Sequence, residues 1–201
     1  MLTVVGMGPA GVQLMTLLAK ETVQRADALV GGTRHLAQFA EFSGERCALG
    51  ANIAEVLAWI GERQGQNVVV LASGDPLFYG IGTRLIAHFG RDNVQVIPGV
   101  SAVQYLCAQA GIDMNEMWLT SSHGRNVNVD ELARHRKVAM VTDSQYGPKE
   151  IAAQLVARGK GHRWMVIGEN LAMENERIHW LPVSEVSADY EMNAVVILDE
   201  R

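Results

Sequence analysis

Short apolar runs alternate along the first half of the chain with longer stretches whose apolar residues have helical spacing. The short runs are 2–5, 28–30, 68–72 and 94–97. Each run is bounded by Gly, Pro, Ser or Asp, a pattern that predicts buried strands. Apolar residues spaced at three and four positions predict helices over 14–23, 53–60, 81–89 and 102–110. Repeated strand–helix units predict a mostly parallel sheet covered by helices.

Polar residues refine two of these helix starts. Asn52 precedes the helix at 53–60, and Glu55 follows three residues later, as in a capping box. Ser101 stands in the same place before the helix at 102–110 and is also a good N-cap residue.

The second half of the chain is less regular. Strands are predicted over 117–120, 138–142, 164–168, 177–182 and 194–198, and a helix over 149–158. No long helix separates the last two strands, so antiparallel pairing is expected there. Residues 111–115 form a polar connector. We therefore expect two α/β domains, 1–112 with a mostly parallel sheet and 113–201 with a mixed sheet.

Composition narrows the functional classes. The chain has 201 residues, of which 48% are hydrophobic, enough for a sizeable core. Its 17 Lys and Arg against 22 Asp and Glu give a net charge of −5, with no basic run, which argues against nucleic-acid binding. Cys47 and Cys107 have neither zinc-ligand spacing nor a disulfide pattern, as expected in a reducing compartment. With no basic leader and no membrane-length apolar run, we expect a cytoplasmic protein without a membrane or metal partner.

A sharply bent polar loop follows the apolar run at 68–72. It reads Ser73-Gly74-Asp75-Pro76 and is followed by the helix at 81–89. Open α/β sheets bind ligands at the carboxyl ends of their strands, which is where this loop lies. Alone, the loop is equally well explained as a strand-to-helix turn in which Asp75 caps the helix.

A glycine-rich loop, 6–11, follows the first strand and resembles a dinucleotide fingerprint. The fingerprint also needs an acidic residue at the end of the second strand, to bind the ribose. Gly31 and Gly32 stand there instead, and Asp27 lies at the other end of that strand. A flavin- or nicotinamide-dependent oxidoreductase therefore remains an alternative, although the chain lacks the acidic residue that this fingerprint requires.

Three more polar loops follow predicted strands, at 98–102, 120–125 and 168–171. Ser101 in the first loop is also an N-cap candidate, and Glu169 in the third is also a candidate for plain surface charge. His123 in the second can act as an acid or base near neutrality, although such a residue is more often structural. Together, the polar loops at successive strand ends predict one elongated small-molecule cleft.

The loops in this order resemble the tetrapyrrole methylase family, and the resemblance covers the whole chain. It rests on Gly6-Met7-Gly8-Pro9, the segment 73–80 and Ile97-Pro98-Gly99-Val100-Ser101-Ala102. Residues 122–125 and 168–171 are similar to the branch that methylates C5 of precorrin-6Y or cobalt-precorrin-7. The length matches a stand-alone C5 enzyme without a fused C15-methylating part. Ala10 and Ser73 depart from the family, which often has Gly at both positions.

The resemblance implies two α/β domains with S-adenosylmethionine bound in a cleft between them, and a homodimer. It implies a C-methyltransferase acting on C5 of a corrin precursor in cobalamin biosynthesis, with a separate C15-methyltransferase and decarboxylase as a functional partner. Methylation at another tetrapyrrole position remains an alternative. The implied cofactor contacts are Pro9, Ser73, Gly74, Asp75, Phe78, Ser101, Ala102, Thr142, Asp143, Gly168 and Asn170.

The corrin substrate would carry many carboxylates, so an acidic protein needs local cations. Arginine binds carboxylates bidentately, and Arg125 in the Ser-His-Gly-Arg loop is the first choice, with Ser122 and Arg34 as further substrate contacts. His35, Arg84 and Lys149 are further cation candidates. His123 is the candidate for proton handling, its alternative role being to orient the loop.

Overall fold

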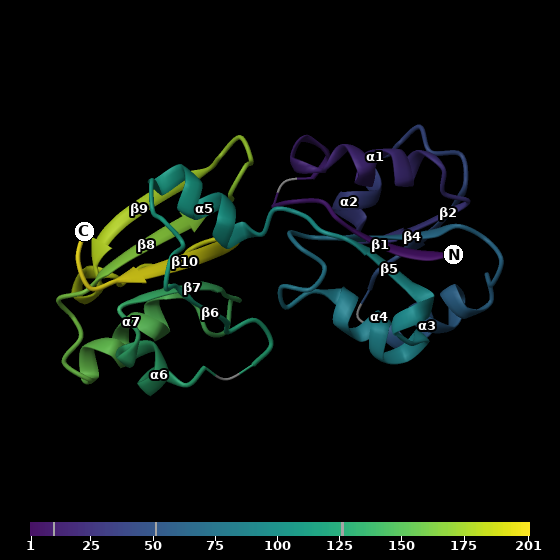
Figure 1. The fold of residues 1–201 in the computed structure, drawn as a ribbon. Helices are drawn as coiled ribbons and strands as arrows, with labels where there is room; N and C mark the ends of the chain where they lie inside the picture. The colour runs from purple at the N-terminus through teal and green to yellow at the C-terminus, as the bar shows by residue number, and fades with distance from the viewer. Residues whose placement is uncertain (10, 51, 126) are drawn as a thin grey trace. The chain divides into compact units, whose positions relative to one another are not determined.

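The computed structural model describes residues 1–9, 11–50, 52–125 and 127–201 (Figure 1). Ala10, at which the sequence departs from the family pattern, lies outside the described residues. The chain divides into two compact units, Met1–Ser101 and Ala102–Arg201, and each contains its own sheet. The predicted α/β class, with one parallel and one mixed sheet, is confirmed.

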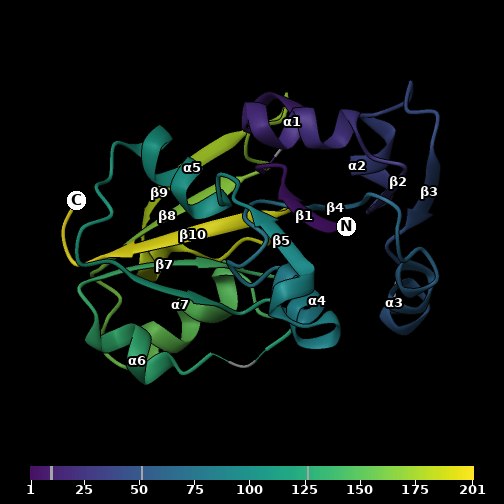
Figure 2. The same ribbon diagram turned by 45° about the vertical axis from the view of Figure 1, so that its right-hand side comes forward.

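The first unit is built on a sheet of five parallel strands, in the order β3-β2-β4-β1-β5. The strands are β1 (Leu2–Gly6), β2 (Ala28–Gly31), β3 (Glu45–Ala48), β4 (Val68–Ala72) and β5 (Val94–Ile97). Figure 2 shows β3 at the outer edge, beside β2. In the dinucleotide-binding order, β1 adjoins β2. Here β4 lies between β2 and β1, so the topology does not support the oxidoreductase alternative.

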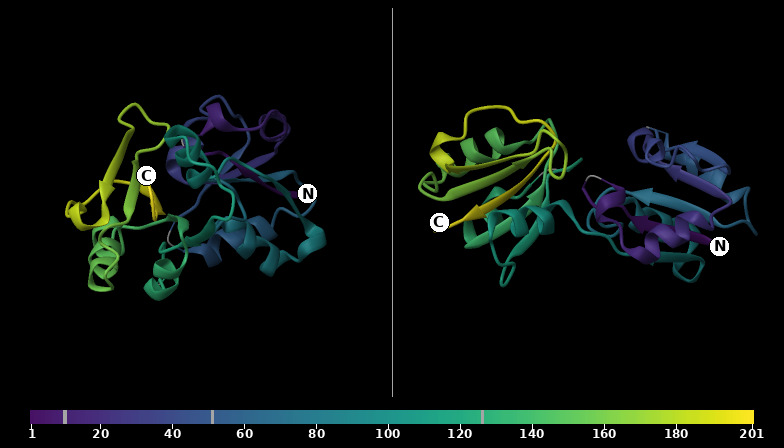
Figure 3. Two further views of the ribbon diagram at one scale, coloured as in Figure 1. Left: turned by 60° about the vertical axis from the view of Figure 1, so that its left-hand side comes forward. Right: turned by 90° about the horizontal axis from the view of Figure 1, so that it is seen from above.

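Helices cover both faces of this sheet (Figures 1 and 3). On one face, α1 (Leu17–Gln24) and α2 (Thr33–Ala37) pack with Val5, Leu29 and Leu71. On the other, α3 (Ile53–Gly61) and α4 (Ile81–Phe89) pack with Val4, Val30 and Val70. Because successive strand residues point to opposite faces, apolar runs such as 68–72 supply both layers.

Strand β3 and helix α2 of the first unit were not predicted, and the predicted cap of α3 was wrong. Strand β3 contains Glu45 and Arg46 and is mostly exposed, so it has no apolar run to reveal it. Helix α2 has only five residues, too few to show a period. Asn52 does not cap α3 with its oxygen; its amide nitrogen instead donates to Glu55 Oε1 at 2.6 Å.

The second unit contains a mixed sheet in the order β6-β7-β10-β8-β9. Its strands are β6 (Trp118–Ser121), β7 (Lys137–Val141), β8 (Trp164–Glu169), β9 (Arg177–Pro182) and β10 (Asn193–Leu198). Only β6 and β7 pair in parallel, and the remaining pairs are antiparallel. Helices α6 (Val129–Arg134), which was not predicted, and α7 (Pro148–Ala157) pack on one face through Leu132, Ile151 and Leu155. The expected pairing of the last two strands with each other was wrong, because β8 lies between β9 and β10 and pairs antiparallel with both.

Helix α5 (Ala102–Ala110) packs on the opposite face of this second sheet. A Cβ on Gly168 would point to that face and would lie 2.7 Å from Leu106 of α5. The helix therefore belongs with the second unit, and the division at Ser101 precedes the predicted boundary at residue 112 by this one helix. Helical spacing continues the strand–helix alternation through α5, but spacing carries no information about which sheet a helix covers.

A fully buried arginine ties the second unit together. Arg163 has no exposed surface, and its guanidinium donates to the carbonyls of Leu132, His135 and Arg136 at 2.7–3.0 Å. Its Nε also lies 2.8 Å from Asp199 Oδ1. Among the described residues, none of the helices is both long and apolar enough to cross a membrane.

Candidate functional site

The backbones of three loops converge where β1, β4 and β5 end. A Cβ on Gly6 would lie 2.5 Å from Gly99 Cα and 2.7 Å from the Gly74 carbonyl oxygen. Gly8 and Gly74 are joined by two backbone hydrogen bonds of 3.0 and 3.2 Å. The glycines of the three sequence motifs therefore allow their backbones to pack directly against one another.

Asp75 uses its carboxylate to hold two of these loops. Its Oδ1 accepts hydrogen bonds from the backbone amides of Leu77 at 2.8 Å and Phe78 at 3.2 Å. Its Oδ2 accepts from the amide of Gly99 at 3.1 Å. The residue predicted to bind the cofactor thus has protein donors on both oxygens.

The other predicted contacts of the first unit differ in exposure. Pro9 and Ser101 are buried, Phe78 is half-buried, and Ser73 and Arg34 are exposed. The Phe78 ring contacts that of Tyr79 edge to face, and Tyr79 has the unusual positive φ of 54°. Arg34 lies on α2, outside the β1, β4 and β5 loops that converge through their glycines.

A cavity of about 200 Å³ lies at this carboxyl edge, beside Ser73. Its lining residues are Gly32, His35, Leu49, Leu71, Ala72, Ser73, Gly80 and Ile81. His35 is only 7% exposed, and its Nε2 has no hydrogen-bond partner among the residues that the structure describes. Burial and the nearby Arg34 lower the pKa of His35 below its usual 6.5. At neutral pH His35 is therefore uncharged, which contradicts its expected role as a cation.

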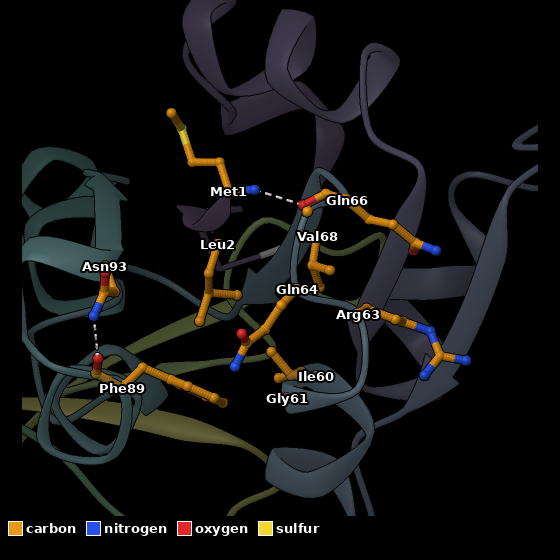
Figure 4. A pocket seen from close by; sticks show the side chains of 11 residues that line it. Met1, Leu2, Ile60, Gly61, Arg63, Gln64, Gln66, Val68, Phe89 and Asn93 are labelled. Carbon is orange, nitrogen blue, oxygen red and sulfur yellow. Dashed lines mark hydrogen bonds between the residues drawn. The ribbon is translucent and has the colours of Figure 1, made fainter.

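A second cavity, of about 340 Å³, lies near the amino ends of β1 and β4 (Figure 4). Leu2, Ile60, Val68 and Phe89 form its apolar part, and the Met1 ammonium donates to the Gln66 carbonyl at 2.5 Å. Parallel α/β sheets bind their ligands at the opposite, carboxyl edge. None of the predicted site residues lines this cavity, and we assign it no function.

The second unit has an equivalent loop arrangement after β6 and β7. Asp143 Oδ1 accepts from the amides of Gln145 at 3.0 Å and Tyr146 at 2.9 Å, and its Oδ2 accepts from Gly124 at 2.8 Å. These bonds, the Gly124 bond first, hold the pKa of Asp143 below its usual 3.8. Asp143 is therefore ionised at neutral pH and binds two loops of its own unit.

The Ser-His-Gly-Arg loop is fixed at its start and exposed at its end. Ser122 is buried and donates to the Tyr146 carbonyl at 2.8 Å, while Ser121 Oγ accepts from the His123 amide at 3.0 Å. His123 and Arg125 are exposed. Hydrogen bonds of Ser121 and Ser122 thus fix the start of the predicted substrate loop, while His123 and Arg125 further along it remain exposed.

A polar network that the sequence did not reveal surrounds the predicted contacts Thr142 and Asn170. Thr142 Oγ1 donates to Asn193 Oδ1 at 2.6 Å, and the side-chain Nδ2 of Asn170 donates to the Glu191 carboxylate. Glu169, only 9% exposed, accepts from the Glu191 amide at 2.8 Å and lies 3.2 Å from His179 Nε2.

The Glu191 amide and His179 also lower the pKa of Glu169 below its usual 4.5. Asn193 begins β10, Glu191 lies two residues before it, and His179 is on β9. No motif in the sequence connects these distant segments to Glu169. Among the described residues, no group of three or more His, Cys, Asp or Glu residues is placed to hold a metal ion.

Residues 1–187 match the model of the tetrapyrrole (corrin/porphyrin) methylases. The chain belongs to this family.

Individual relatives agree with this assignment. The chain is 75% identical over 201 residues to the cobalt-precorrin-7 C(5)-methyltransferase of Salmonella typhimurium, and the match covers all of both chains. It is 32% identical to the decarboxylating precorrin-6Y C(5,15)-methyltransferase of a Sinorhizobium species, over 88% of this chain and 44% of that protein. The crystal structure of the precorrin-6Y methylase of Archaeoglobus fulgidus superposes with a TM-score of 0.78 at 25% identity, covering 100% of this chain and 99% of that one.

Proposed function

We propose that this tetrapyrrole methylase transfers a methyl group from S-adenosylmethionine to C5 of cobalt-precorrin-7. The observation that carries the proposal is the 75% identity, over the full length of both chains, with the Salmonella cobalt-precorrin-7 C(5)-methyltransferase. The polar loops at the strand ends of both units supply groups suited to the two ligands.

The residues of the first unit suit a polar cofactor. S-adenosylmethionine carries an ammonium, a carboxylate and a ribose besides its sulfonium. Within the described part of the chain, Ser73 has an exposed hydroxyl without a hydrogen-bond partner, and Gly6 and Gly99, at and just beyond the ends of β1 and β5, carry no side chain. We propose that Pro9, Ser73, Gly74, Phe78 and Ser101 contact the cofactor here.

Further cofactor contacts are proposed in the second unit. They are Ala102, Thr142, Gly168 and Asn170. Thr142, Gly168 and Asn170 are buried at or just beyond the ends of β7 and β8, where the Asn193 and Glu191 side chains hold Thr142 and Asn170. A rigid backbone at Gly168 and Asn170 suits recognition through main-chain groups.

The chemistry needs positioning more than a catalytic base. The sulfonium–methyl bond breaks as a bond forms from the methyl group to C5, leaving S-adenosylhomocysteine. The meso carbon of a reduced tetrapyrrole is enamine-like and already nucleophilic. Holding donor and acceptor in line can lower such a barrier by up to roughly 7–11 kcal/mol. His123 is proposed to handle a proton after transfer, since it is exposed beside Arg125.

Substrate recognition is proposed to rest on arginine. Arg125 is exposed on the loop that Ser121 and Ser122 fix, and Arg34 is exposed at the start of α2. Guanidinium groups form paired hydrogen bonds with carboxylates. Ser122 donates to a backbone carbonyl, so its proposed contribution is to hold the loop that carries Arg125.

Methyl transfer to a defined substrate tests the proposal. The protein is incubated with methyl-labelled S-adenosylmethionine and cobalt-precorrin-7, and the product is analysed by mass spectrometry and NMR. We expect one labelled methyl group, attached to C5. A label at another carbon would move the activity to another tetrapyrrole position. Failure to bind S-adenosylhomocysteine, together with a bound flavin or nicotinamide, would replace the methyltransferase proposal.

Two assembly properties are proposed alongside this activity. The longer Sinorhizobium relative is named for both C5 and C15 methylation, whereas this chain spans 44% of its length. We propose that a separate C15-methyltransferase and decarboxylase acts together with this chain. The expected homodimer is tested by light scattering during size-exclusion chromatography.

A further inference from the structure

The carboxylates of Asp75 and Asp143 make the same set of hydrogen bonds in the two units. Each residue lies just beyond the carboxyl end of a strand, β4 or β7. In each, Oδ1 accepts from the amides two and three residues later, and Oδ2 accepts from a glycine amide in the loop after another strand. The glycine is Gly99 after β5 in the first unit and Gly124 after β6 in the second.

The first unit has the space that this bond requires. β1 lies between β4 and β5, so Asp75 must reach past the end of β1 to meet Gly99. Gly6 ends β1, and a Cβ there would lie 2.5 Å from both Gly99 Cα and the Gly99 nitrogen. Its bare backbone therefore lets the loop that contains Gly99 come within reach of Asp75.

We infer that Asp75 and Asp143 are positioning residues, which hold paired ligand-binding loops together instead of contacting a ligand through their carboxylates. The inference rests on the proposed function for which ligand each loop binds. Asp75 fixes the 98–101 loop and thereby Ser101, a proposed cofactor contact. Asp143 fixes the 122–125 loop and thereby Arg125, a proposed substrate contact.

The carboxylate is needed because both oxygens accept. An asparagine has one accepting oxygen and one donating nitrogen, so it can hold its own turn or the glycine amide, but not both. The side chain of Asn is well suited to the turn formed with the amides two and three residues later. Asp→Asn should therefore keep the turn and release the glycine of the second loop.

The two variants should act on different ligands. Asp75→Asn should weaken S-adenosylhomocysteine binding about tenfold while the KM for cobalt-precorrin-7 stays within about twofold, since one charge-assisted hydrogen bond is worth about that factor or more. Asp143→Asn should raise that KM about tenfold and leave S-adenosylhomocysteine binding within about twofold. A loss of stability alone does not produce this reciprocal pattern.

Asp27→Asn is the matched control. Asp27 Oδ2 accepts the amide of Asn67 at 2.7 Å, which also joins two segments of the first unit, but at the amino ends of β2 and β4. Its loss should lower stability without changing either ligand affinity. Calorimetry with S-adenosylhomocysteine and steady-state kinetics measure both affinities in the full chain.

Amide hydrogen exchange tests the bonds independently of the reaction. We expect the Gly99 amide to exchange about tenfold faster in Asp75→Asn, and the Gly124 amide in Asp143→Asn. In the unaltered protein, a scalar coupling through the hydrogen bond should connect the Gly99 nitrogen to the Asp75 carboxyl carbon. That measurement needs no variant to fold.

Distinct results separate the two proposals. Absence of the coupling, unchanged exchange at both glycines, or equal loss of both affinities in each variant would overturn the positioning role. If the coupling and exchange results hold but cobalt-precorrin-7 is not methylated, the proposed function fails while the two carboxylates keep their loop-holding role.

Discussion

At the scale of single residues, Gly99 is closely surrounded by the backbone of two other predicted site segments. A Cβ there would lie 2.7 Å from Gly6 Cα and still closer to the Gly74 carbonyl, and both neighbours are backbone. Overpacking of this kind typically costs 1–3 kcal/mol. We expect Gly99→Ala to lower the free energy of unfolding by about 2 kcal/mol in urea titrations. Gly50→Ala, with nothing within 4 Å of its Cβ, should change it by less than about 0.5 kcal/mol. Equal effects would contradict the crowding.

Glu169 gives the second unit a stability that depends on pH. The Glu191 amide, with a smaller effect of His179, holds its pKa in the folded chain below the usual 4.5. A carboxyl group whose pKa is lower in the folded than in the unfolded chain stabilises the folded state. The full stabilisation is present above the pKa of the unfolded chain and is lost as the pH falls through the pKa of the folded chain. We expect Glu169→Gln to be about 1 kcal/mol less stable at pH 7, with the gap closing below pH 4.5.

Thermal unfolding between pH 3 and 7 measures this gap. The exposed Glu200→Gln variant serves as the control and should follow the unaltered chain throughout. A gap that stays constant on acidification would show that the carboxylate charge at Glu169 is not the cause.

The positions of the polar loops can be predicted from the sequence, but the role of each side chain in them cannot. The Asp-Pro loop, the Pro-Gly loop and the Ser-His-Gly-Arg loop are visible because each follows an apolar strand. The partners of Asp75 and Asp143 are not visible, because Gly99 and Gly124 are 24 and 19 residues away and meet them only through sheet order. His35 looks like a cation until its burial is known.

At the scale of elements, Arg163 connects α6, the start of β7 and the region after β10. Removing it takes one donor from each of three carbonyls and leaves Asp199 only its longer, exposed pair with Arg136. A buried hydrogen-bonding group that loses its partner typically costs about 1–3 kcal/mol. We expect Arg163→Ala to lose about 3 kcal/mol and Arg163→Lys to lose less, because lysine still supplies charge and donors.

Chemical denaturation followed by circular dichroism measures this effect. Arg136→Ala is the control, because its side chain is 81% exposed and pairs with Asp199 and Glu200 only at 3.7–4.0 Å. Surface pairs of this kind contribute at most about 1 kcal/mol. A similar loss in both variants would contradict the role assigned to Arg163.

Elements with a clear apolar run or period were predicted, and polar strands and very short helices were not. Strands β1, β4, β7 and β8 and helices α3 and α4 have continuous or periodic apolar residues. Helices α2 and α6 have five and six residues, too few to show a helical period, and β3 is mostly exposed. The packing of α5 depends on Leu106 meeting the bare backbone of Gly168, a contact between distant segments.

At the scale of the whole molecule, each unit has its own hydrophobic core. Leu71, 1% exposed, lies in a core of the first unit, and Ile167, fully buried, lies in the core of the second. Truncation of either side chain to alanine typically costs 2–5 kcal/mol. Because a core holds only the elements that pack on it, each truncation should loosen its own sheet first.

Hydrogen exchange with peptide resolution tests this independence. Leu71→Ala should speed exchange in β1, β2 and β4 and leave β7, β8 and β10 unchanged, and Ile167→Ala should do the reverse. Equal acceleration of both sheets by either variant would mean that the chain opens as one cooperative unit. S-adenosylhomocysteine should slow exchange of residues 73–78 and 168–170 in the unaltered chain, since the proposed contacts come from both units. Protection confined to one of these segments would remove the proposed contacts of the other.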